Sequence, residues 1–326
     1  MAAGSVLVTG GAGYIGSVAA ERLLERGEPV VVLDNLSRGF EDAVPRGARF
    51  IEGDIADRGL LRSLFREHSV RAVMHFAAFA LVGESVQTPE IYYRNNVIGS
   101  LTLIEEARAA GVERFILSST CAVYGDRNTG PLAETMPRAP VNPYGETKMA
   151  IERALEWIHA ASGWPYFALR YFNACGATAG HGERHNPETH LIPHVLRAAA
   201  GEAESVSILG ADYPTPDGTC IRDYIHVEDL ADAHICALHA PAETSGAYNV
   251  ATGRGYSVRE VIEAARRLTG RPIREKICPR RPGDPPMLVA DASKIQKTFG
   301  WRARHDLDSA LRSAWAFQMR QQAIRS

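Results

Sequence analysis

The first half of the chain alternates short, continuously apolar segments with longer stretches in which apolar residues recur at helical spacing. The short segments predict six β-strands, at residues 5–9, 29–34, 48–54, 71–77, 113–120 and 165–172. The longer stretches predict helices near residues 14–26, 57–68, 88–110 and 144–162. Strands that are apolar throughout are buried on both faces, and alternation with helices calls for crossover connections. The pattern therefore predicts an α/β fold with a doubly wound parallel sheet.

A smaller lobe is predicted to follow, because the rhythm changes after Asn173. A segment rich in glycine and histidine, residues 173–188, precedes shorter elements. These are helices from Leu191, from Glu228, at residues 258–268 and from about Leu307, with strands near residues 206–209 and 222–227. We expect this mixed α/β lobe to cover the carboxyl ends of the first sheet, where open α/β sheets bind ligands. The predicted domains are residues 1–173 and 174–326, with some segments of the second returning to the first.

Composition narrows the possible partners. Of 326 residues, 45% are hydrophobic and 23% are charged, and a net charge of −2 without a basic block argues against nucleic acid as a partner. The apolar runs are far shorter than the roughly 18 residues of a membrane span, and the first residues hold no cleavable apolar segment. We therefore expect a cytoplasmic protein without membrane contact. Its five scattered cysteines form no CxxC pair, which indicates reduced thiols.

A glycine-rich turn links the first predicted strand to the first helix. Its sequence is TGGAGYIG, in which Gly10, Gly13 and Gly16 let the backbone turn tightly, approach a pyrophosphate and pack a helix on a strand. Asp34 ends the second strand, where its carboxylate can accept hydrogen bonds from an adenosine ribose and repel a 2′-phosphate. This context predicts a Rossmann-like domain that binds NAD, although the nearby Arg38 weakens the preference for NAD over NADP.

A tyrosine and a lysine stand four residues apart in a predicted helix. Tyr144 and Lys148 follow Pro143, so both side chains share one helix face. A free phenol has a pKa near ~10, and a lysine ammonium beside it favours the phenolate that an acid–base catalyst needs. The chain contains only four lysines, so a lysine at this spacing is uncommon for its composition. The hydroxyls of residues 118–120, at the end of the fifth strand, can relay a substrate proton to Tyr144.

These segments resemble the extended short-chain dehydrogenase/reductase superfamily and, within it, the UDP-glucose 4-epimerase family. The resemblance covers nearly the whole chain. Besides the glycine turn and NPYGETK, it rests on VLDNLSRG, EGDI, YYRNNVIGS, SSTCAVYG, RYFNACGA, DYPTPDGTCIRDYIHVEDLADAH and RRPGDPPMLVADASK. It implies a tightly held NAD that is regenerated at each turnover. It further implies interconversion of UDP-galactose and UDP-glucose by oxidation at C4, rotation of the 4-keto sugar and return of the hydride.

The resemblance also implies roles for residues at matching positions. Tyr144 is the expected base, Lys148 its partner on the nicotinamide ribose, and Thr120 the hydroxyl that holds the substrate. The expected cofactor contacts are Gly10, Gly13, Tyr14, Ile15, Gly16, Asp34, Asn35, Asp54, Ile55, Phe76, Ala77, Ala78, Asn95, Tyr144, Lys148 and Phe172. The expected contacts to the UDP-sugar are Thr120, Tyr144, Asn173, His190, Leu191, Leu209, Arg222, Arg281, Asp284 and Leu288. The two arginines suit a diphosphate because a guanidinium can bind it in a bidentate way.

Several positions depart from the family pattern or stay open. Ala80 stands where some members have a lysine near the cofactor phosphates, Leu209 where some have a phenylalanine against uracil, and His190 where others have asparagine. Leu288 stands at the expected wall of the sugar pocket, where a small residue tends to admit N-acetylhexosamines and tyrosine tends to exclude them. By position alone, Asp54 is equally a solvated carboxylate at a strand end.

Histidines and glutamates crowd in the glycine- and histidine-rich segment and at the start of the helix that follows. They are His181, Glu183, His185, Glu188, His190 and His194. The last two histidines are four residues apart, a spacing that can present two imidazoles to a metal ion. The resemblance instead places His190 in the substrate loop and leaves the others at the surface, so no metal site is expected.

Other functions stay open beside the implied one. The chain could epimerise another UDP-sugar, such as a pentose, a uronic acid or an N-acetylhexosamine, or it could sense NAD without catalysis. Intact Tyr144 and Lys148 argue against a non-catalytic role. A 4,6-dehydratase fits less well, because such enzymes carry an Asp-Glu pair just after the threonine, where this chain has Cys121 and Ala122.

The predicted helices near residues 88–110 and 144–162 carry apolar stripes. The stripe residues are Val97, Leu101, Ile104, Ile151, Leu155 and Ile158. Packing in the core explains such stripes as well as an interface does. The resemblance implies a homodimer formed through these two helices.

Overall fold

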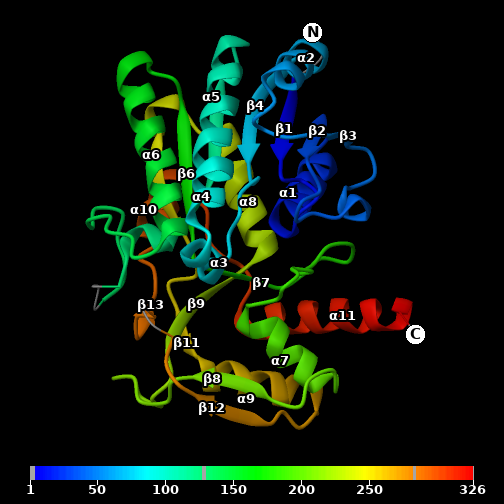
Figure 1. Cartoon of the computed structure of the whole chain (residues 1–326), viewed down its shortest axis with the longest axis vertical. Helices are drawn as coiled ribbons and strands as arrows, with labels where there is room; N and C mark the ends of the chain where they lie inside the picture. Colours follow the sequence, from blue (N-terminus) through cyan, green and yellow to red (C-terminus); the bar gives the residue numbers. More distant parts are fainter. Residues whose placement is uncertain (1–3, 127–129, 282–283, 326) are drawn as a thin grey trace.

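A seven-stranded parallel sheet forms the centre of the larger lobe (Figure 1). The computed structural model describes residues 4–126, 130–281 and 284–325. Within them the strand order is β10-β6-β5-β4-β1-β2-β3, and neighbouring strands run parallel. The strands are β1 (Ser5–Thr9), β2 (Val30–Asp34), β3 (Arg49–Glu52), β4 (Val70–His75), β5 (Arg114–Thr120), β6 (Tyr166–Tyr171) and β10 (Gly246–Val250). The predicted doubly wound, Rossmann-like sheet is therefore confirmed.

Helices cover both faces of this sheet, because successive residues of a strand point to opposite sides. The helices are α1 (Tyr14–Glu25), α2 (Arg58–His68), α3 (Val82–Gln87), α5 (Ser100–Ala109), α6 (Pro143–Ser162), α8 (Val227–His239) and α10 (Ser293–Phe299). Val6 and Val8 of β1 pack in one core with residues of α1 and α8, whereas Leu7 packs in another with residues of α2, α5 and α6. None of the helices in the described ranges combines the length and apolarity of a membrane crossing.

The helix predicted near residues 88–110 is present, but it is not α-helical throughout. A short helix, α4 (Pro89–Tyr92), leads into a π-helical segment, η2 (Tyr93–Gly99), before α5 begins. Asn96 in this wider turn is fully buried, and its side-chain amide both accepts a hydrogen bond from Phe79 N and donates one to Phe79 O. The apolar spacing of the segment stays close to helical, so it cannot reveal the wider turn that accompanies this polar contact.

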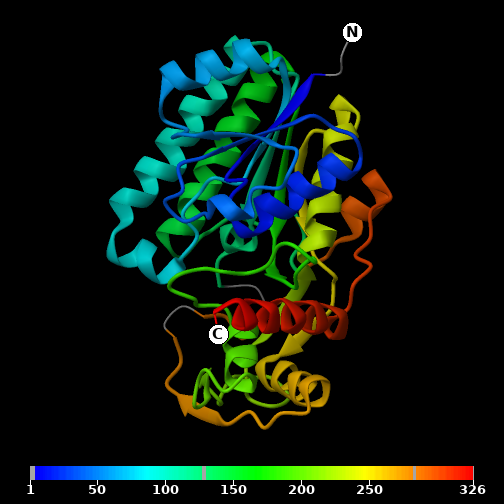
Figure 2. The ribbon, with the colours of Figure 1, turned by 90° about the vertical axis from the view of Figure 1, so that its right-hand side faces the viewer.

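The second lobe lies at the carboxyl ends of the large sheet (Figures 1 and 2). Its central strand, β9 (Ile221–His226), pairs in parallel with β7 (Asn173–Cys175) and β13 (Met287–Leu288) and antiparallel with β11 (Gly255–Ser257). A separate parallel pair joins β8 (Val206–Leu209) to β12 (Glu275–Cys278). Around one apolar core these strands meet α7 (Leu191–Ala199), α9 (Val258–Thr269) and α11 (Leu307–Arg325). The expected smaller mixed lobe is confirmed.

Several segments beyond residue 173 return to the large sheet, among them α10 (Ser293–Phe299). β10 extends the sheet beside β6, and residues of α8 pack with residues of α1 in one apolar core. The chain therefore crosses between the lobes more than once, and the division at residue 173 stays a prediction.

Candidate active site

The glycine turn forms a cradle at the carboxyl end of β1. Gly10 has a φ of +74°, in the left-handed region, and a Cβ at this position would meet the backbone of Ala77. A Cβ on Gly16 would collide with the carbonyl oxygen of Gly10. α1 starts after Gly13 without a side-chain cap, so its first N–H groups remain available at the positive end of the helix dipole. The cradle therefore fits the pyrophosphate of the expected NAD.

Asp34, at the end of β2, is the carboxylate expected to face the adenosine ribose. Its Oδ2 accepts a hydrogen bond from Ala12 N at 3.0 Å, and its Oδ1 accepts one from Leu36 N at 2.9 Å. Burial raises the pKa of this carboxyl, against the lowering effect of the two backbone hydrogen bonds. Arg38, which weakened the case for NAD, forms an ion pair with Glu84 at 2.5 Å. The nearby guanidinium thus has an anionic partner within the protein, which favours NAD over a cofactor with an additional phosphate.

Tyr144 lies in the first turn of α6, close to the end of β5. Asn142 caps this helix, because its Oδ1 accepts a hydrogen bond from Gly145 N at 2.9 Å. Burial raises the pKa of Tyr144 to about 12, against the smaller effect of a hydrogen bond with the Thr120 side chain. Thr120 Oγ1 in turn accepts a hydrogen bond from Ala122 N at 3.1 Å. The structure thus brings the expected base and the expected substrate-binding hydroxyl into contact.

Lys148 lies one helical turn after Tyr144 and is 2% exposed. Its Nζ donates a hydrogen bond to Ser118 O at 2.7 Å, which anchors the lysine to β5. Burial lowers the pKa of Lys148 to about 8, although the charge of Glu152 acts in the opposite direction. Lys148 therefore carries its proton at neutral pH and can stabilise a phenolate on the same helix face.

The hydroxyls at the end of β5 have different tasks. Ser119 Oγ donates a hydrogen bond to Glu152 Oε1 at 2.5 Å, and Glu152 also forms a buried ion pair with Arg170 at 2.7 Å. Ser119 therefore belongs to a network that ties β5 and β6 to α6. Thr120, by contrast, bonds Tyr144. Position alone did not distinguish the three adjacent hydroxyls, whereas the family resemblance pointed to Thr120, and the hydrogen bonds favour the same residue.

Further expected cofactor residues surround the glycine turn. Asn35 Nδ2 donates to Asp54 Oδ2 at 2.8 Å, which joins the ends of β2 and β3. Phe76 N donates to Thr9 O at 2.9 Å, which sets the segment after β4 beside the glycine turn. The remaining ones are Tyr14 and Ile15 at the start of α1, Ile55 after β3, Ala77 and Ala78 after β4, Asn95 in η2 and Phe172 after β6. Apart from Asn95, these positions follow strands or begin helices at the edge of the sheet where ligands of this fold bind.

The second lobe brings three of the expected substrate residues together. Arg222 on β9 is buried, and its Nη2 lies 3.5 Å from Asp284 Oδ1. Leu288 on β13 stands opposite Arg222 in the parallel register. Leu288 also packs against an apolar cluster that contains Cys121, the residue after Thr120, and Phe172, an expected cofactor contact. The residues expected to contact the phosphates and the sugar therefore adjoin the Tyr144 side of the site.

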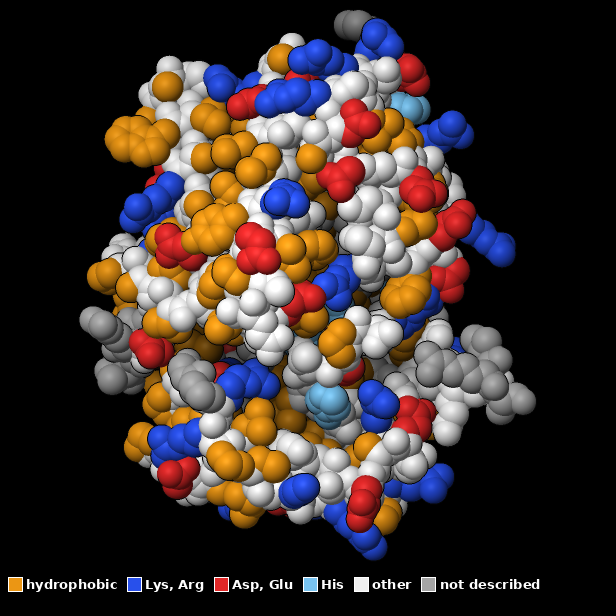
Figure 3. Space-filling model, in the orientation of Figure 1, with side chains coloured by type: hydrophobic (Ala, Val, Ile, Leu, Met, Phe, Trp, Pro, Cys, Tyr) orange, Lys and Arg blue, Asp and Glu red, His pale blue; other side chains and the backbone are white. Residues whose placement is uncertain are grey.

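The other expected substrate residues are spread along the second lobe. They are Asn173 at the start of β7, His190 and Leu191 at the start of α7, Leu209 at the end of β8 and the exposed Arg281. The space-filling view shows basic and histidine side chains where the two lobes meet (Figure 3). This placement suits a substrate held between the lobes.

Sequence reasoning missed one contribution to the cofactor region. Residues 176–185 run from the second lobe across to the glycine turn, where the Tyr14 hydroxyl donates to Gly176 O at 2.6 Å. Arg184 pairs with Asp42 at 2.8 Å and lies over the Phe40 ring. This segment and the glycine turn line a common small cavity. Only its glycine- and histidine-rich composition marked the segment in the sequence, and composition does not show where a loop runs.

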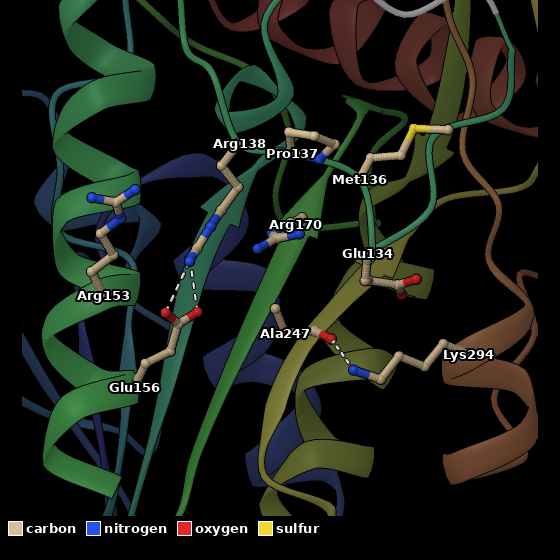
Figure 4. A pocket seen from close by; sticks show the side chains of 9 residues that line it. All are labelled: Glu134, Met136, Pro137, Arg138, Arg153, Glu156, Arg170, Ala247 and Lys294. Atoms are coloured by element: carbon tan, nitrogen blue, oxygen red, sulfur yellow. Dashed lines mark hydrogen bonds and ion pairs between the residues drawn. The ribbon is translucent and has the colours of Figure 1, made fainter. Parts of the chain in front are cut away.

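A pocket of about 570 Å³ lies elsewhere, among α6, β6, β10 and α10 (Figure 4). Its charged side chains have partners within the protein: Arg138 pairs with Glu156 at 2.7 Å, and Lys294 Nζ donates to Ala247 O at 2.7 Å. None of the expected catalytic, cofactor or substrate residues lines it. This pocket is therefore separate from the residues expected to carry the chemistry.

Comparison with known proteins decides the family. Residues 6–251 match the NAD dependent epimerase/dehydratase family. This chain belongs to that family. It is 49% identical to the UDP-glucose 4-epimerase of Halalkalibacterium halodurans over 316 residues, which cover 95% of this chain and 94% of the relative.

Solved structures of relatives have the same fold as this epimerase/dehydratase family member. The UDP-glucose 4-epimerase of Brucella ovis, in complex with NAD, aligns with a TM-score of 0.93 at 47% identity, covering 97% of this chain and 98% of that one. The enzyme of Bifidobacterium longum, in complex with NAD⁺ and UDP, aligns with a TM-score of 0.92 at 38% identity, covering 98% and 99%. The resemblance to this family that the sequence motifs carried is confirmed.

Proposed function

We propose that this chain interconverts UDP-galactose and UDP-glucose with bound NAD. The observation that carries the proposal is the contact of Tyr144 with Thr120, with Lys148 one helical turn away and bonded to the same strand, in a fold whose glycine cradle fits a dinucleotide. The naming of close relatives as UDP-glucose 4-epimerases supports the choice of substrate. Incubation of the purified chain with UDP-galactose, followed by sugar analysis, tests it. UDP-glucose is the expected product, and unchanged UDP-galactose would contradict the proposal.

Three side chains handle the proton of the sugar 4-hydroxyl. Thr120 positions this hydroxyl by a hydrogen bond, and Tyr144 takes its proton and later returns it. Because burial holds the pKa of Tyr144 at about 12, the phenolate needs a positive charge close by, which Lys148 supplies. When bound, NAD supplies the acceptor and donor of the hydride at C4.

The protein binds the substrate mainly through its nucleotide part and makes fewer contacts with the sugar. Arg222 and Arg281 carry the guanidinium groups suited to the diphosphate. Binding energy from this remote part of the substrate holds the complex together while the hexose stays free enough to present either face. A 4-keto sugar that turns over in the pocket requires this division of contacts.

Dehydration fits the site poorly. Elimination needs an additional acid–base pair beside Thr120, and Cys121 is the residue that follows. Burial raises the pKa of the Cys121 thiol to about 12, so it neither donates nor accepts protons readily at neutral pH. Epimerisation needs only the single base that Tyr144 provides.

Asp34 should set the preference for NAD over NADP. We expect Asp34→Asn, which removes the charge but keeps the size of the side chain, to lower the ratio of the NADP to the NAD dissociation constant at least about 10-fold. Calorimetric titration of cofactor-free protein with each dinucleotide measures this ratio. Asp54→Asn serves as the control and should leave the ratio unchanged. An equal loss of affinity for both cofactors in Asp34→Asn would show that this carboxylate does not discriminate between them.

Leu288 should limit the size of the sugar. Its branched side chain fills space that an acetamido group needs and offers that amide no hydrogen-bond partner, a cost of about 1–3 kcal/mol. We expect a clear preference for UDP-galactose over UDP-N-acetylgalactosamine, and Leu288→Ser should narrow the kcat/KM ratio of the two by about tenfold. Steady-state kinetics with both sugars measure it. If Leu288→Ser has the same kcat/KM ratio for the two sugars as the native chain, Leu288 does not limit the size of the sugar.

A homodimer is proposed from the exposed apolar side chains near α6. Three residues of the predicted stripes, Ile104, Ile151 and Leu155, are buried in the core of the chain. These side chains therefore cannot contact a second copy. Trp157 on α6 is 76% exposed and Ile98 on η2 is 57% exposed. Hydrophobic side chains gather over α4, α5 and α6 on the face seen in Figure 3. Such an apolar surface is typical of an association site.

Light scattering tests this association. We expect the native chain to behave as a dimer and Trp157→Arg to behave as a 35.5 kDa monomer. Ile277→Arg is a matched control, because Ile277 on β12 is 62% exposed but lies in the other lobe. A native chain that scatters as a 35.5 kDa particle at micromolar concentration would refute the dimer.

The cytoplasm is the compartment we propose. All five cysteines are free thiols, including the buried Cys121 and Cys175. Free thiols are typical of proteins that work in a reducing environment. Detection of the protein in separated cell fractions tests this compartment, and we expect the protein in the cytoplasmic fraction.

A further inference from the structure

The loop between β7 and α7 gathers two imidazoles and two carboxylates. They come from two Glu-x-His pairs, Glu183 with His185 and Glu188 with His190. One ligand atom from each of these four side chains lies within 4.8 Å of the other three. The grouping differs from the one that the sequence suggested, in which His190 stood with His194. A pair of short Glu-x-His units brings four ligands together within eight residues.

Contacts inside the cluster leave polar atoms without adequate partners. His190 Nδ1 lies 2.9 Å from Glu188 Oε1 and 3.7 Å from Glu183 Oε2. Glu183 Oε1 and His185 Nδ1 face each other as an ion pair, yet both atoms are buried and neither has a partner in hydrogen-bonding geometry. A buried polar atom without a hydrogen bond is costly, and a cation shared by the four side chains would remove this cost.

Neighbouring charged groups are engaged elsewhere. Arg184, which lies between two of the four residues, turns to Asp42. His181 faces Glu21, with 3.4 Å between the Nε2 and Oε1 atoms. Arg184 therefore does not neutralise the two glutamates of the cluster. Of the other arginines, Arg281 acts on the cluster through its charge, which lowers the pKa of His190 against the opposite effects of Glu183 and Glu188.

A second group of possible ligands in the described part of the chain has three side chains instead of four, although His305 Nδ1 in it also lacks a hydrogen-bond partner. His226, Glu228 and His305 also place ligand atoms close together. However, His226 Nδ1 accepts a hydrogen bond from Glu228 N at 3.1 Å, and its Nε2 lies 3.0 Å from Ser313 Oγ. Both ring nitrogens of His226 are thus occupied. This group serves as an internal contrast for the experiment below.

We propose that Glu183, His185, Glu188 and His190 bind one divalent transition-metal ion of the zinc class. Two imidazole nitrogens and two carboxylate oxygens form a donor set that suits Zn²⁺ in tetrahedral geometry. Mg²⁺ and Ca²⁺ prefer oxygen ligands alone and fit this set less well. The ion would fix the loop in front of α7, and with it His190, the residue expected at the substrate. The proposal does not rest on the proposed function, since its tests measure metal and not turnover.

Metal titration of the full chain tests the site. The protein is prepared with NAD bound and without a histidine tag, stripped with EDTA, and titrated with Zn²⁺ by calorimetry and with Co²⁺ by visible absorption. One equivalent of Zn²⁺ and the intense d–d bands of four-coordinate Co²⁺ are expected. His185→Ala and the isosteric Glu188→Gln should each weaken Zn²⁺ binding at least about 10²-fold. His194→Ala is the matched control and should bind Zn²⁺ as the native chain does.

The same titrations can overturn the proposal. It fails if the native chain binds no Zn²⁺ with a Kd below about 0.1 mM, a weak affinity for a four-ligand site. It also fails if His185→Ala and Glu188→Gln, each shown by circular dichroism to be folded, bind Zn²⁺ as tightly as the native chain. Loss of binding in His305→Ala but not in His185→Ala would place the ion at the other group and overturn the assignment. Epimerase activity enters none of these outcomes.

Discussion

Replacement of Tyr144 by phenylalanine should lower the turnover of UDP-galactose at least about 10²-fold, the usual contribution of an acid–base group. The change removes only the hydroxyl that bonds Thr120 and keeps the ring at the start of α6. The glycine cradle and Asp34 are untouched, so the variant should still hold NAD. Steady-state kinetics give the loss, and cofactor released by denaturation gives the NAD content.

A matched control separates the hydroxyl from the general effect of losing a tyrosine. Tyr166 lies on β6 with its ring buried in the core between the sheet and its helices. Tyr166→Phe should therefore keep turnover close to the native value. If Tyr144→Phe turns over UDP-galactose at more than a tenth of the native rate, Tyr144 is not the catalytic base.

Replacement of Lys148 by methionine should also lower turnover by about 10²-fold or more at neutral pH, because the phenolate loses its nearby cation. The loss should shrink as the pH rises. Without Lys148, the fraction of Tyr144 phenolate depends on pH alone and grows about tenfold per pH unit, because burial raises the pKa of this phenol above the pH range measured. In the native enzyme the rise should weaken above pH 8, since the Lys148 ammonium, with a pKa of about 8, loses its proton there. Turnover measured across pH 6 to pH 10 tests both slopes.

Lys294 offers the control for this substitution. Like Lys148, it donates a hydrogen bond to a backbone carbonyl at 2.7 Å, in this case that of Ala247. It lines the pocket of Figure 4, away from Tyr144. Lys294→Met should leave both turnover and its pH profile unchanged. A Lys148→Met profile parallel to the native one would show that the lysine does not act through the phenol.

The sheet could be predicted because its signal is local. Val6, Leu7 and Val8 are apolar in succession, and the structure buries them on alternate faces under different helices. β10 (Gly246–Val250) was missed, although it extends the same sheet. Its sequence, GAYNV, is short, begins with glycine and contains an asparagine, and what makes it a strand is its pairing with β6, nearly 80 positions earlier. Such long-range pairing leaves no periodic trace in the strand itself.

The candidate site divides in the same way. Two features of the site could be predicted from the sequence, because each lies within one supersecondary unit. They are the spacing of Tyr144 and Lys148 on one helix and the strand–turn–helix context of the glycines. The engagement of Arg38 by Glu84 and the choice of Thr120 over Ser119 depend on side chains from distant segments. The gathering of Glu183 with His190 depends on the path of an irregular loop, for which the sequence gives no period.

Transfer of isotope at C4 tests the central claim most directly. The purified chain, carrying only the NAD it retains, is given UDP-galactose labelled with deuterium at C4, and the product is analysed by mass spectrometry and NMR. We expect UDP-glucose that keeps the deuterium at C4, because the hydrogen leaves as hydride and returns to the same carbon without exchange with water. UDP-glucose that has exchanged this deuterium for solvent hydrogen would contradict the account.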